Sequence, residues 1–228
     1  MLSDWHYGIN IDLYENKFNT DICEERIAKL LCNVKNLVSN TKIKKLYIVN
    51  LSDLIAGRIH LPLRINSQVD TITQILRVSE ILADFINELS ALVPIEFYNC
   101  LDNHSRLEPN KKESLDLESL ARIVPWFIKE RLSFNKNVHV NDNKYGEDII
   151  TFNCNGHNVI GVHGDNDKPT QVVTNLTLLT NNIYDLMLTA HRHHFSADEE
   201  NQTVIVSNGT LMGCDNFSHK LRKSSKPS

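Results

Sequence analysis

Five short polar clusters, each at the end of an apolar run, constrain this sequence more than any other feature. They read SDWH, LSDL, LDNH, GVHGD and AHRHH, and their possible ligands are Asp4, His6, Asp53, Asn103, His104, His163, His191 and His193. Because the carboxyl ends of strands in an α/β sheet meet at one edge, we expect these side chains to converge there. The sequence therefore predicts an α/β fold built around a single site.

Hydrophobic periodicity supports this fold class. Apolar residues at helical spacing predict helices over 22–38 with Asp21 as the N-cap, over 68–91, over 116–133 with a break at Pro125, and over 169–180. Strand-like runs cover 46–49, 94–99, 137–141, 148–153, 157–162, the run before AHRHH, and 203–209. Strands alternate with helices early and gather later, which indicates a mixed sheet or two packed sheets flanked by helices.

Length and charge set the limits of the interpretation. A chain of 228 residues with no shift in composition is expected to form one domain, over 1–218, followed by a basic tail over 219–228. The net charge of −4 gives no global electrostatic case for nucleic-acid binding, and the basic clusters at 42–45, 110–112 and 219–226 are read as solvated surface or tail.

Cysteine usage and hydropathy favour a cytoplasmic protein. The five cysteines are widely spaced and form no CxxC pair, which is typical of reduced thiols. The apolar runs are shorter than the roughly 20 residues that a membrane span needs, and the first ten residues do not resemble a signal peptide.

The chemistry of the clusters indicates a metal site. Carboxylate, imidazole and amide groups suit Mn²⁺, Fe²⁺, Zn²⁺ or Ni²⁺, and the absence of cysteine argues against structural zinc. On a strand, the D-x-H of Asp4 and His6 and the H-x-H of His191 and His193 would each place both side chains on one face. The two oxygens of Asp53 are suited to bridging two cations about 3.5–4 Å apart.

The order of the clusters resembles the calcineurin-like metallophosphoesterase superfamily. The chain presents D-x-H, then D-x-x-x-x-R, N-H, a lone H before glycine, and H-x-H, over residues 4–193. The stretches NHSRLEPNKKE and GVHGDND are similar to the DNA repair exonuclease-like (SbcD-type) members of phages and prophages. The resemblance implies two packed mixed β-sheets flanked by helices, a four-layer α-β-β-α sandwich.

The resemblance also implies roles for individual residues. One metal would be held by Asp4, His6, Asp53 and His193, and the other by Asp53, Asn103, His163 and His191. His104 would not be a ligand but would stabilise the transition state or protonate the leaving oxygen. Two Mn²⁺ ions are expected, with Fe²⁺, Zn²⁺ or Ni²⁺ as alternatives.

Other residues near the clusters have less specific expectations. Arg58 and Arg106 are candidates for gripping a phosphate, although structural salt bridges explain them equally well. Asp165 is a candidate for orienting His163. Five further histidines are assigned no role: His60, His139, His157, His194 and His219.

Three positions depart from the family pattern. Ser52, Asp102 and Ala190 stand where the family has glycine. Aspartate tolerates φ > 0 better than most residues, so Asp102 is expected to substitute for glycine there, at the cost of a negative charge near the second metal. The chain also begins only three residues before Asp4, which leaves little room for a preceding strand.

The expected function is a binuclear metal-dependent phosphodiesterase, nuclease-like and acting on a nucleic acid or a nucleotide, in which a metal-bridging hydroxide attacks phosphorus. The alternatives are a phosphomonoesterase acting on protein or nucleotide, and a degenerate member that binds metal without turnover. A homodimer or a partner ATPase remains open, and no membrane partner is expected.

Overall fold

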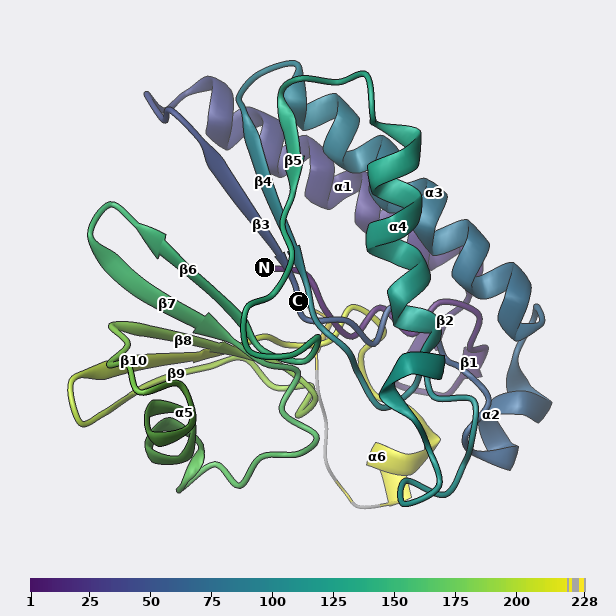
Figure 1. Ribbon diagram of the computed structural model, residues 1–228. Coiled ribbons are helices and arrows are strands. Elements are labelled where there is room, and N and C mark those ends of the chain that lie inside the picture. Colours follow the sequence, from purple (N-terminus) through teal and green to yellow (C-terminus); the bar gives the residue numbers. More distant parts are fainter. Residues whose placement is uncertain (221, 223–225, 228) are drawn as a thin grey trace.

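Two packed β-sheets form the centre of the computed structural model, which describes residues 1–220, 222, 226 and 227 (Figure 1). The first sheet is parallel throughout, in the order β3 (Leu46–Asn50), β4 (Ile95–Asn99) and β5 (Val138–Val140). The second is mixed, in the order β6 (Ile150–Cys154), β7 (His157–Gly161), β8 (Leu186–Thr189), β10 (Thr203–Ser207) and β9 (Ser196–Glu200). The predicted fold class is confirmed, although only the second sheet is mixed.

Helices cover the outer faces of both sheets, which gives four layers (Figure 1). The first sheet carries α1 (Thr20–Ser39), α3 (Thr71–Ser90) and α4 (Ile123–Arg131), and the second carries α5 (Val172–Thr180). The smaller elements are the hairpin of β1 (Ile11–Asp12) and β2 (Lys17–Phe18), α2 (Leu61–Asn66), the 3₁₀ turns η1 (Asp116–Glu118) and η2 (Leu120–Arg122), and α6 (Asn216–Lys220). None of the helices within the described residues is long and apolar enough to cross a membrane.

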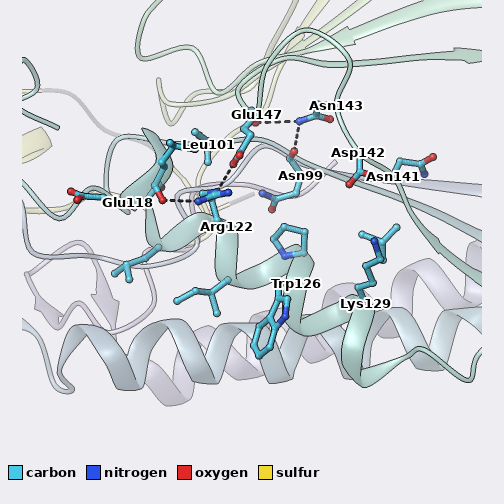
Figure 2. Close-up of a pocket in the computed structure, with 16 residues that line it drawn as sticks. Asn99, Leu101, Glu118, Arg122, Trp126, Lys129, Asn141, Asp142, Asn143 and Glu147 are labelled. Carbon is cyan, nitrogen blue, oxygen red and sulfur yellow. Dashed lines mark hydrogen bonds and ion pairs between the residues drawn. The ribbon is translucent and has the colours of Figure 1, made fainter. Parts of the chain in front are cut away.

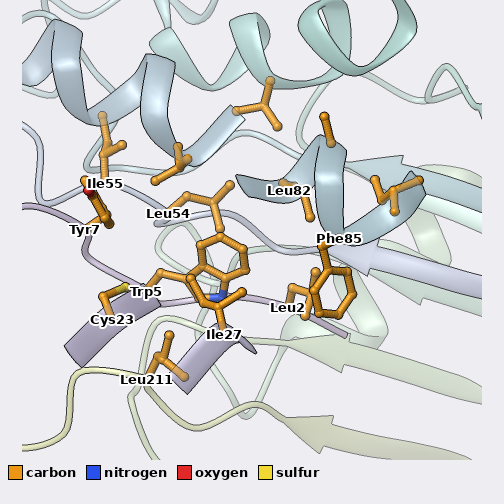
Figure 3. Close-up of a cluster of buried hydrophobic side chains, with 14 of the residues drawn as sticks. Leu2, Trp5, Tyr7, Cys23, Ile27, Leu54, Ile55, Leu82, Phe85 and Leu211 are labelled. Carbon is orange, nitrogen blue, oxygen red and sulfur yellow. The ribbon is translucent and has the colours of Figure 1, made fainter. Parts of the chain in front are cut away.

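Separate apolar clusters hold the layers together. Between the two sheets, Leu51 and Tyr98 of the first sheet's side pack with Ile150 and Ala190 of the second. The ring of Phe152 stacks on the rings of Tyr47 and Tyr98, at centroid distances of 4.9 and 4.8 Å. A larger cluster lies between the first sheet and its helices (Figure 3), and a smaller one lies beneath α5. The strand ends are therefore fixed from both sides.

The N-terminal segment lies beside the chain that continues from β3. Isolated parallel bridges pair Leu2 with Asn50 and Tyr7 with Ile55. The side chain of Trp5 is buried in the large core cluster, close to Leu54 (Figure 3). In the described part of the chain, one bridge and no strand precedes D-x-H, as the short preceding segment predicts, and the Trp5 side chain anchors the loop between the two bridges.

Several local predictions were wrong for identifiable reasons. Asn19, not Asp21, caps α1, because its side chain accepts a hydrogen bond from the Ile22 N–H. Pro125 does not break a helix, because α4 begins at Ile123 and proline is tolerated in a first turn. The elements α2, β1, β2, β9 and α6 were not predicted. Helix α6 crosses the expected start of the basic tail, of which residues 221, 223–225 and 228 lie outside the described residues.

Candidate metal centre

The five polar clusters meet at the carboxyl ends of four strands. Asp53 follows β3, Asn103 follows β4, His163 follows β7, and His191 and His193 follow β8. The N-terminal segment adds Asp4 and His6 beside Asp53, held by backbone hydrogen bonds from Asp4 N to Ser52 O (2.9 Å) and from His6 N to Asp53 O (3.1 Å). The structure therefore brings every predicted ligand to one edge of the sheets.

The D-x-H and H-x-H motifs were expected to lie on strands, and this expectation was wrong. Asp4 and His6 have φ angles of 52° and 48°, and His191 and His193 have φ angles of 68° and 60°. Asp4 and His6 both belong to the first ligand group, while Trp5 between them enters the core, and the H-x-H pair is divided, with His193 in the first group and His191 in the second. Such backbone is uncommon for residues other than glycine, and it occurs mostly where the surrounding structure enforces it.

The first group of ligands consists of Asp4, His6, Asp53 and His193, whose ligand atoms all lie within 4.8 Å of one another. The Nε2 atoms of His6 and His193 are 3.1 Å apart, and His193 Nε2 is 3.4 Å from Asp4 Oδ1. The hydroxyl of Ser3 donates to the other Asp4 oxygen at 2.5 Å and itself accepts from the Asn208 amide. Asp4 therefore has one oxygen fixed and one directed inward.

The second group consists of Asp53, His163 and His191, again within 4.8 Å, so Asp53 belongs to both groups. His163 Nε2 is 3.1 Å from Asp53 Oδ2 and 3.1 Å from Asn103 Oδ1. Its Nδ1 lies 2.7 Å from the Leu51 carbonyl, which can only accept, so Nδ1 carries a proton and Nε2 is the nitrogen that faces the other members of the group.

Asp165 does not orient His163, as had been expected. Its carboxylate instead pairs with Lys111 at 2.8 Å, and the backbone carbonyl of Leu51 orients the ring. A carbonyl is a common orienting partner for a ligating histidine.

Burial and charge set the protonation of the cluster. Burial raises the pKa of Asp53, but the nearby His163 and His104 outweigh it and hold that pKa well below its ordinary value. Burial, and then His104, hold the pKa of His6 well below 6.5. Burial lowers the pKa of His163, yet the nearby charge of Asp53 raises it to about 10. Without a cation, a proton on His163 therefore balances the charge of Asp53.

The cluster fits divalent cations because it leaves buried polar atoms unsatisfied. Asp4 Oδ1, Asp53 Oδ2 and His191 Nδ1 are buried and have no hydrogen-bond partner in the described structure. All three atoms belong to residues of the two ligand groups. Unpaired buried polar atoms are costly, and coordination to a cation would satisfy them. The mixture of imidazole and carboxylate suits borderline divalent ions.

His104 lies beside the two groups but belongs to neither. Its Nδ1 is 2.8 Å from the Ala56 carbonyl, so Nδ1 is protonated and Nε2 faces the site, 4.0 Å from Asp53 Oδ2. Its ring meets that of His6 at a centroid distance of 4.6 Å. The backbone N–H of His104 donates to Asp53 Oδ1 at 3.2 Å, which ties this loop to the shared carboxylate.

Ser52, Asp102 and Ala190, where the superfamily that the motifs resemble has glycine, differ from one another in conformation and contacts. Ser52 has a φ of 65°, and its hydroxyl donates to the Cys100 carbonyl at 2.5 Å. Asp102 and Ala190 are outside the left-handed region, so the expectation that Asp102 is accommodated by a positive φ was wrong. Asp102 is buried, and its carboxylate accepts hydrogen bonds from Asp53 N, Ser105 N and Ser105 Oγ.

An open cleft of about 530 Å³ lies over the cluster. Its lining includes His60, Arg192 and His194, none of which was singled out from the sequence. The available signal was their place: Arg192 lies inside H-x-H, and His194 follows it. Arg58 is exposed and absent from this lining, and Arg106 lines a separate pocket with Lys111. Phosphate binding by Arg58 and Arg106 stays a prediction, without support from their placement.

A second cavity of about 730 Å³ lies between α4 and the segment after β5 (Figure 2). Trp126 and Lys129 line it from the helix, with Asn141 and Asn143 on the opposite wall. Arg122 is already engaged there, because it donates to Glu147 and to the Leu117 carbonyl. None of the eight possible ligands in the polar clusters lines this cavity, so it is separate from the candidate metal centre.

Comparison with known proteins gives distant matches. No family model matches the chain. The SPbeta prophage-derived uncharacterized protein YonJ of Bacillus subtilis (strain 168) is 23% identical over 236 residues, which cover 98% of this chain and 57% of that protein. The chain thus spans little more than half the length of the curated relative that it matches.

Two solved structures overlap most of the chain. A novel archaeal phosphodiesterase is 12% identical, with 82% of this chain and 78% of that chain covered and a TM-score of 0.41. Zinc-bound Vps29 from Entamoeba histolytica is 9% identical, with 86% and 72% covered and a TM-score of 0.42. Similarity at this level does not assign a function to the chain.

Proposed function

We propose that the chain is a binuclear metal-dependent phosphodiesterase. One observation carries the proposal: two groups of ligand atoms, each within 4.8 Å, share the carboxylate of Asp53. A carboxylate with two oxygens can bridge two cations, and two-metal sites with a separation of about 3.5–4 Å are used for hydrolysis at phosphorus. Asn103 Oδ1, 3.1 Å from His163 Nε2, supplies a neutral oxygen to the second group.

The side chains of the site would have two roles, cation binding and proton delivery. When bound, two divalent cations would acidify a water for attack on phosphorus and offset the charge that develops on the phosphoryl oxygens. Asp4, His6, Asp53 and His193 would hold one cation, and Asp53, Asn103, His163 and His191 the other. His104 presents Nε2 to the site while Nδ1 is fixed by Ala56 O. With both ring nitrogens protonated, it would deliver the Nε2 proton to the leaving oxygen and keep the Nδ1 proton.

The proposal is tested with Asp53→Asn protein loaded with Mn²⁺. Loss of the shared carboxylate should lower the metal content. It should also lower the rate of hydrolysis of bis(p-nitrophenyl) phosphate by at least about 100-fold, a factor within the range for removal of a group that stabilises the transition state. Asp21→Asn makes the same chemical change at an exposed site on α1 and should behave as wild type. Equal rates for Asp53→Asn and wild type would refute the proposal.

Two alternatives are separated in the same assay. A phosphomonoesterase would hydrolyse p-nitrophenyl phosphate faster than the diester. A degenerate member would hold less than one tightly bound ion per chain and turn over neither substrate. Elemental analysis after loading with Mn²⁺, Fe²⁺, Zn²⁺ or Ni²⁺ in turn identifies the preferred ion.

Substrate, partner and origin are proposed more broadly. We propose a phosphodiester of the nucleotide kind as the substrate, and a nucleic-acid strand is the alternative that the exonuclease-like motifs suggest. The prophage-derived name of YonJ supports a prophage origin, and a partner ATPase or a homodimer is proposed for the assembly. Size-exclusion chromatography of the purified chain would test for a homodimer.

A further inference from the structure

The cleft over the ligand groups differs sharply along its walls, and this points to its substrate. We propose that the cleft selects a small phosphodiester that carries, besides its leaving group, one apolar or aromatic substituent. A nucleic-acid strand is excluded, and Leu63 is a specificity-determining residue. The inference rests on the proposed function, because it places the scissile phosphate at the metal centre.

One wall of the cleft is apolar and held in place by the fold. Ile9 and Ile11 are buried with the large core cluster, and Leu63 packs against the same cluster. Pro62 and Met212 complete this wall. Its two parts are joined by a hydrogen bond from Asn10 N to Asn66 O at 3.0 Å and by the bridge between Ile9 and Ser67. The wall is thus present before any ligand binds.

The size of the cleft suits one ring beside one phosphate. Its volume of about 530 Å³ falls within the roughly 300–1,000 Å³ of small-molecule sites. Such sites are lined mainly by apolar side chains, with a few polar groups that orient the ligand. Here Asn10, Asn66 and His60 are polar residues of the lining that can orient a ligand beside the apolar side chains.

The charge of the cleft does not suit a polyanion. Among the described residues, Arg192 is the one lysine or arginine in the lining, and the lining also contains Asp215. Strand β9 begins two residues after His194 and carries three exposed or half-exposed acids, Asp198, Glu199 and Glu200. Proteins that bind nucleic-acid strands place several cations along the backbone path. One cation is enough for a single diester, and Arg192 is suited to contact its phosphate.

The first experiment compares substrates with the Mn²⁺-loaded full chain. The substrates are bis(p-nitrophenyl) phosphate, p-nitrophenyl thymidine 5′-phosphate, methyl p-nitrophenyl phosphate and a single-stranded 20-mer. The three small diesters share a p-nitrophenyl leaving group and differ in the substituent that is retained. The two diesters whose retained substituent is a ring should exceed the methyl ester in kcat/KM by about tenfold, a factor of the size expected for burying part of that ring. The thymidine and aryl arms distinguish a nucleoside from another ring. A higher kcat/KM per bond for the 20-mer would overturn the inference.

The second experiment uses variants on α2 and a readout without turnover. Leu63→Asn should weaken binding of phenylphosphonate by about five- to tenfold and leave binding of methylphosphonate unchanged, as measured by calorimetry. Ile65→Asn makes a comparable change on the same helix, at an exposed residue outside the lining, and should have no effect. Leu63→Met keeps an apolar side chain and should restore the preference. Equal losses for both phosphonates, or a loss in Ile65→Asn, would overturn the inference.

The two failures are distinguishable. If no phosphoester is hydrolysed but phenylphosphonate still binds more tightly than methylphosphonate in a Leu63-dependent way, the proposed function fails and the apolar site stands. If diesters are hydrolysed without any preference for a ring, the proposed function stands and the inference fails.

Discussion

The carboxylate of Asp102 accepts a hydrogen bond from the backbone N–H of Asp53 at 3.0 Å. The same carboxylate accepts from the N–H and the hydroxyl of Ser105, at 2.6 and 2.9 Å. It therefore joins the backbone of the shared ligand, where φ is 51°, to the loop that carries Asn103 and His104. Asp102, where the superfamily that the motifs resemble has glycine, links two loops that carry candidate ligands.

Removal of this link should destabilise the chain. Asp102→Ala leaves three buried donors without their acceptor, and each unsatisfied group costs about 1–3 kcal/mol. We expect the free energy of unfolding to fall by about 3 kcal/mol or more in urea denaturation of the metal-free protein. Asp102→Asn keeps one carbonyl acceptor and should lose less. A change below about 0.5 kcal/mol for Asp102→Ala, the range of ordinary surface substitutions, would contradict this.

The charge of Asp102 should also make stability depend on pH. Burial, and then the negative charge of Asp53, raise the pKa of Asp102 from 3.8 to about 6. The folded state therefore binds this proton more tightly than the unfolded state, so the stabilisation is complete below pH 3.8 and is lost as pH rises through about 6. The difference in unfolding free energy between wild type and Asp102→Asn should shrink over this window. A difference independent of pH would show that Asp102 does not titrate there.

His104 should affect turnover without affecting metal binding. Positioned acids and bases contribute about 10²–10⁴-fold to rate, so His104→Gln should lower kcat for a diester by that factor. Metal content should stay at the wild-type level, because His104 belongs to neither ligand group. His139→Gln, at an exposed position of β5, is the matched control. Loss of metal in His104→Gln would contradict the assignment.

Gly57 should be indispensable for the placement of His104. A Cβ on Gly57 would overlap the carbonyl oxygen of His104, and the φ of 70° adds strain for any other residue. Gly57→Ala should therefore lower kcat by at least about tenfold, since small displacements of catalytic groups are costly. Gly156→Ala has a similar backbone strain, with a φ of 92°, but no atom within 4 Å of the new Cβ. Equal activities of the two variants would refute this prediction.

Metal binding should release protons. In the metal-free protein, burial acts against a charged His163, but the neighbouring Asp53 raises its pKa to about 10. The imidazole is thus protonated at pH 7.5, and it must lose that proton to act as a ligand, so about one proton per chain should be released. Calorimetry of Mn²⁺ binding in Hepes and in Tris, whose ionisation enthalpies differ, measures this number. Identical heats in both buffers would contradict it.

The positions of the candidate ligands after residue 50 were predictable from the sequence because each follows an apolar strand closely. Asp53, Asn103 and His163 come within a few residues of β3, β4 and β7, and the topology does the rest. The helices α1 and α3 were predicted for a similar reason, since their apolar residues repeat at helical spacing. The roles of individual ligands remain predictions that only metal binding and kinetics can test.

Contacts between distant residues were not predictable. Asp102 and Asp53 are separated by 49 positions, and no local pattern connects them. Strand β9 reads SADEE and lacks apolar alternation, so its pairing depends on β10. The left-handed ligands were missed because D-x-H fits a strand equally well by spacing alone. In each case tertiary contacts override the local preference.

The left-handed backbone at Asp4 and Asp53 restricts which residues these positions can hold, whether or not the chain hydrolyses a substrate. Asp, Asn and Gly adopt left-handed conformations most readily, so these positions are restricted by shape as well as by chemistry. A lineage that lost the proposed activity would still keep Asp, Asn or Gly at positions 4 and 53, because the backbone conformation requires them. His104, which lies outside the left-handed region, would vary first. In divergent copies of the chain, loss of the proposed activity should therefore be accompanied by substitution at position 104 before substitution at positions 4 and 53.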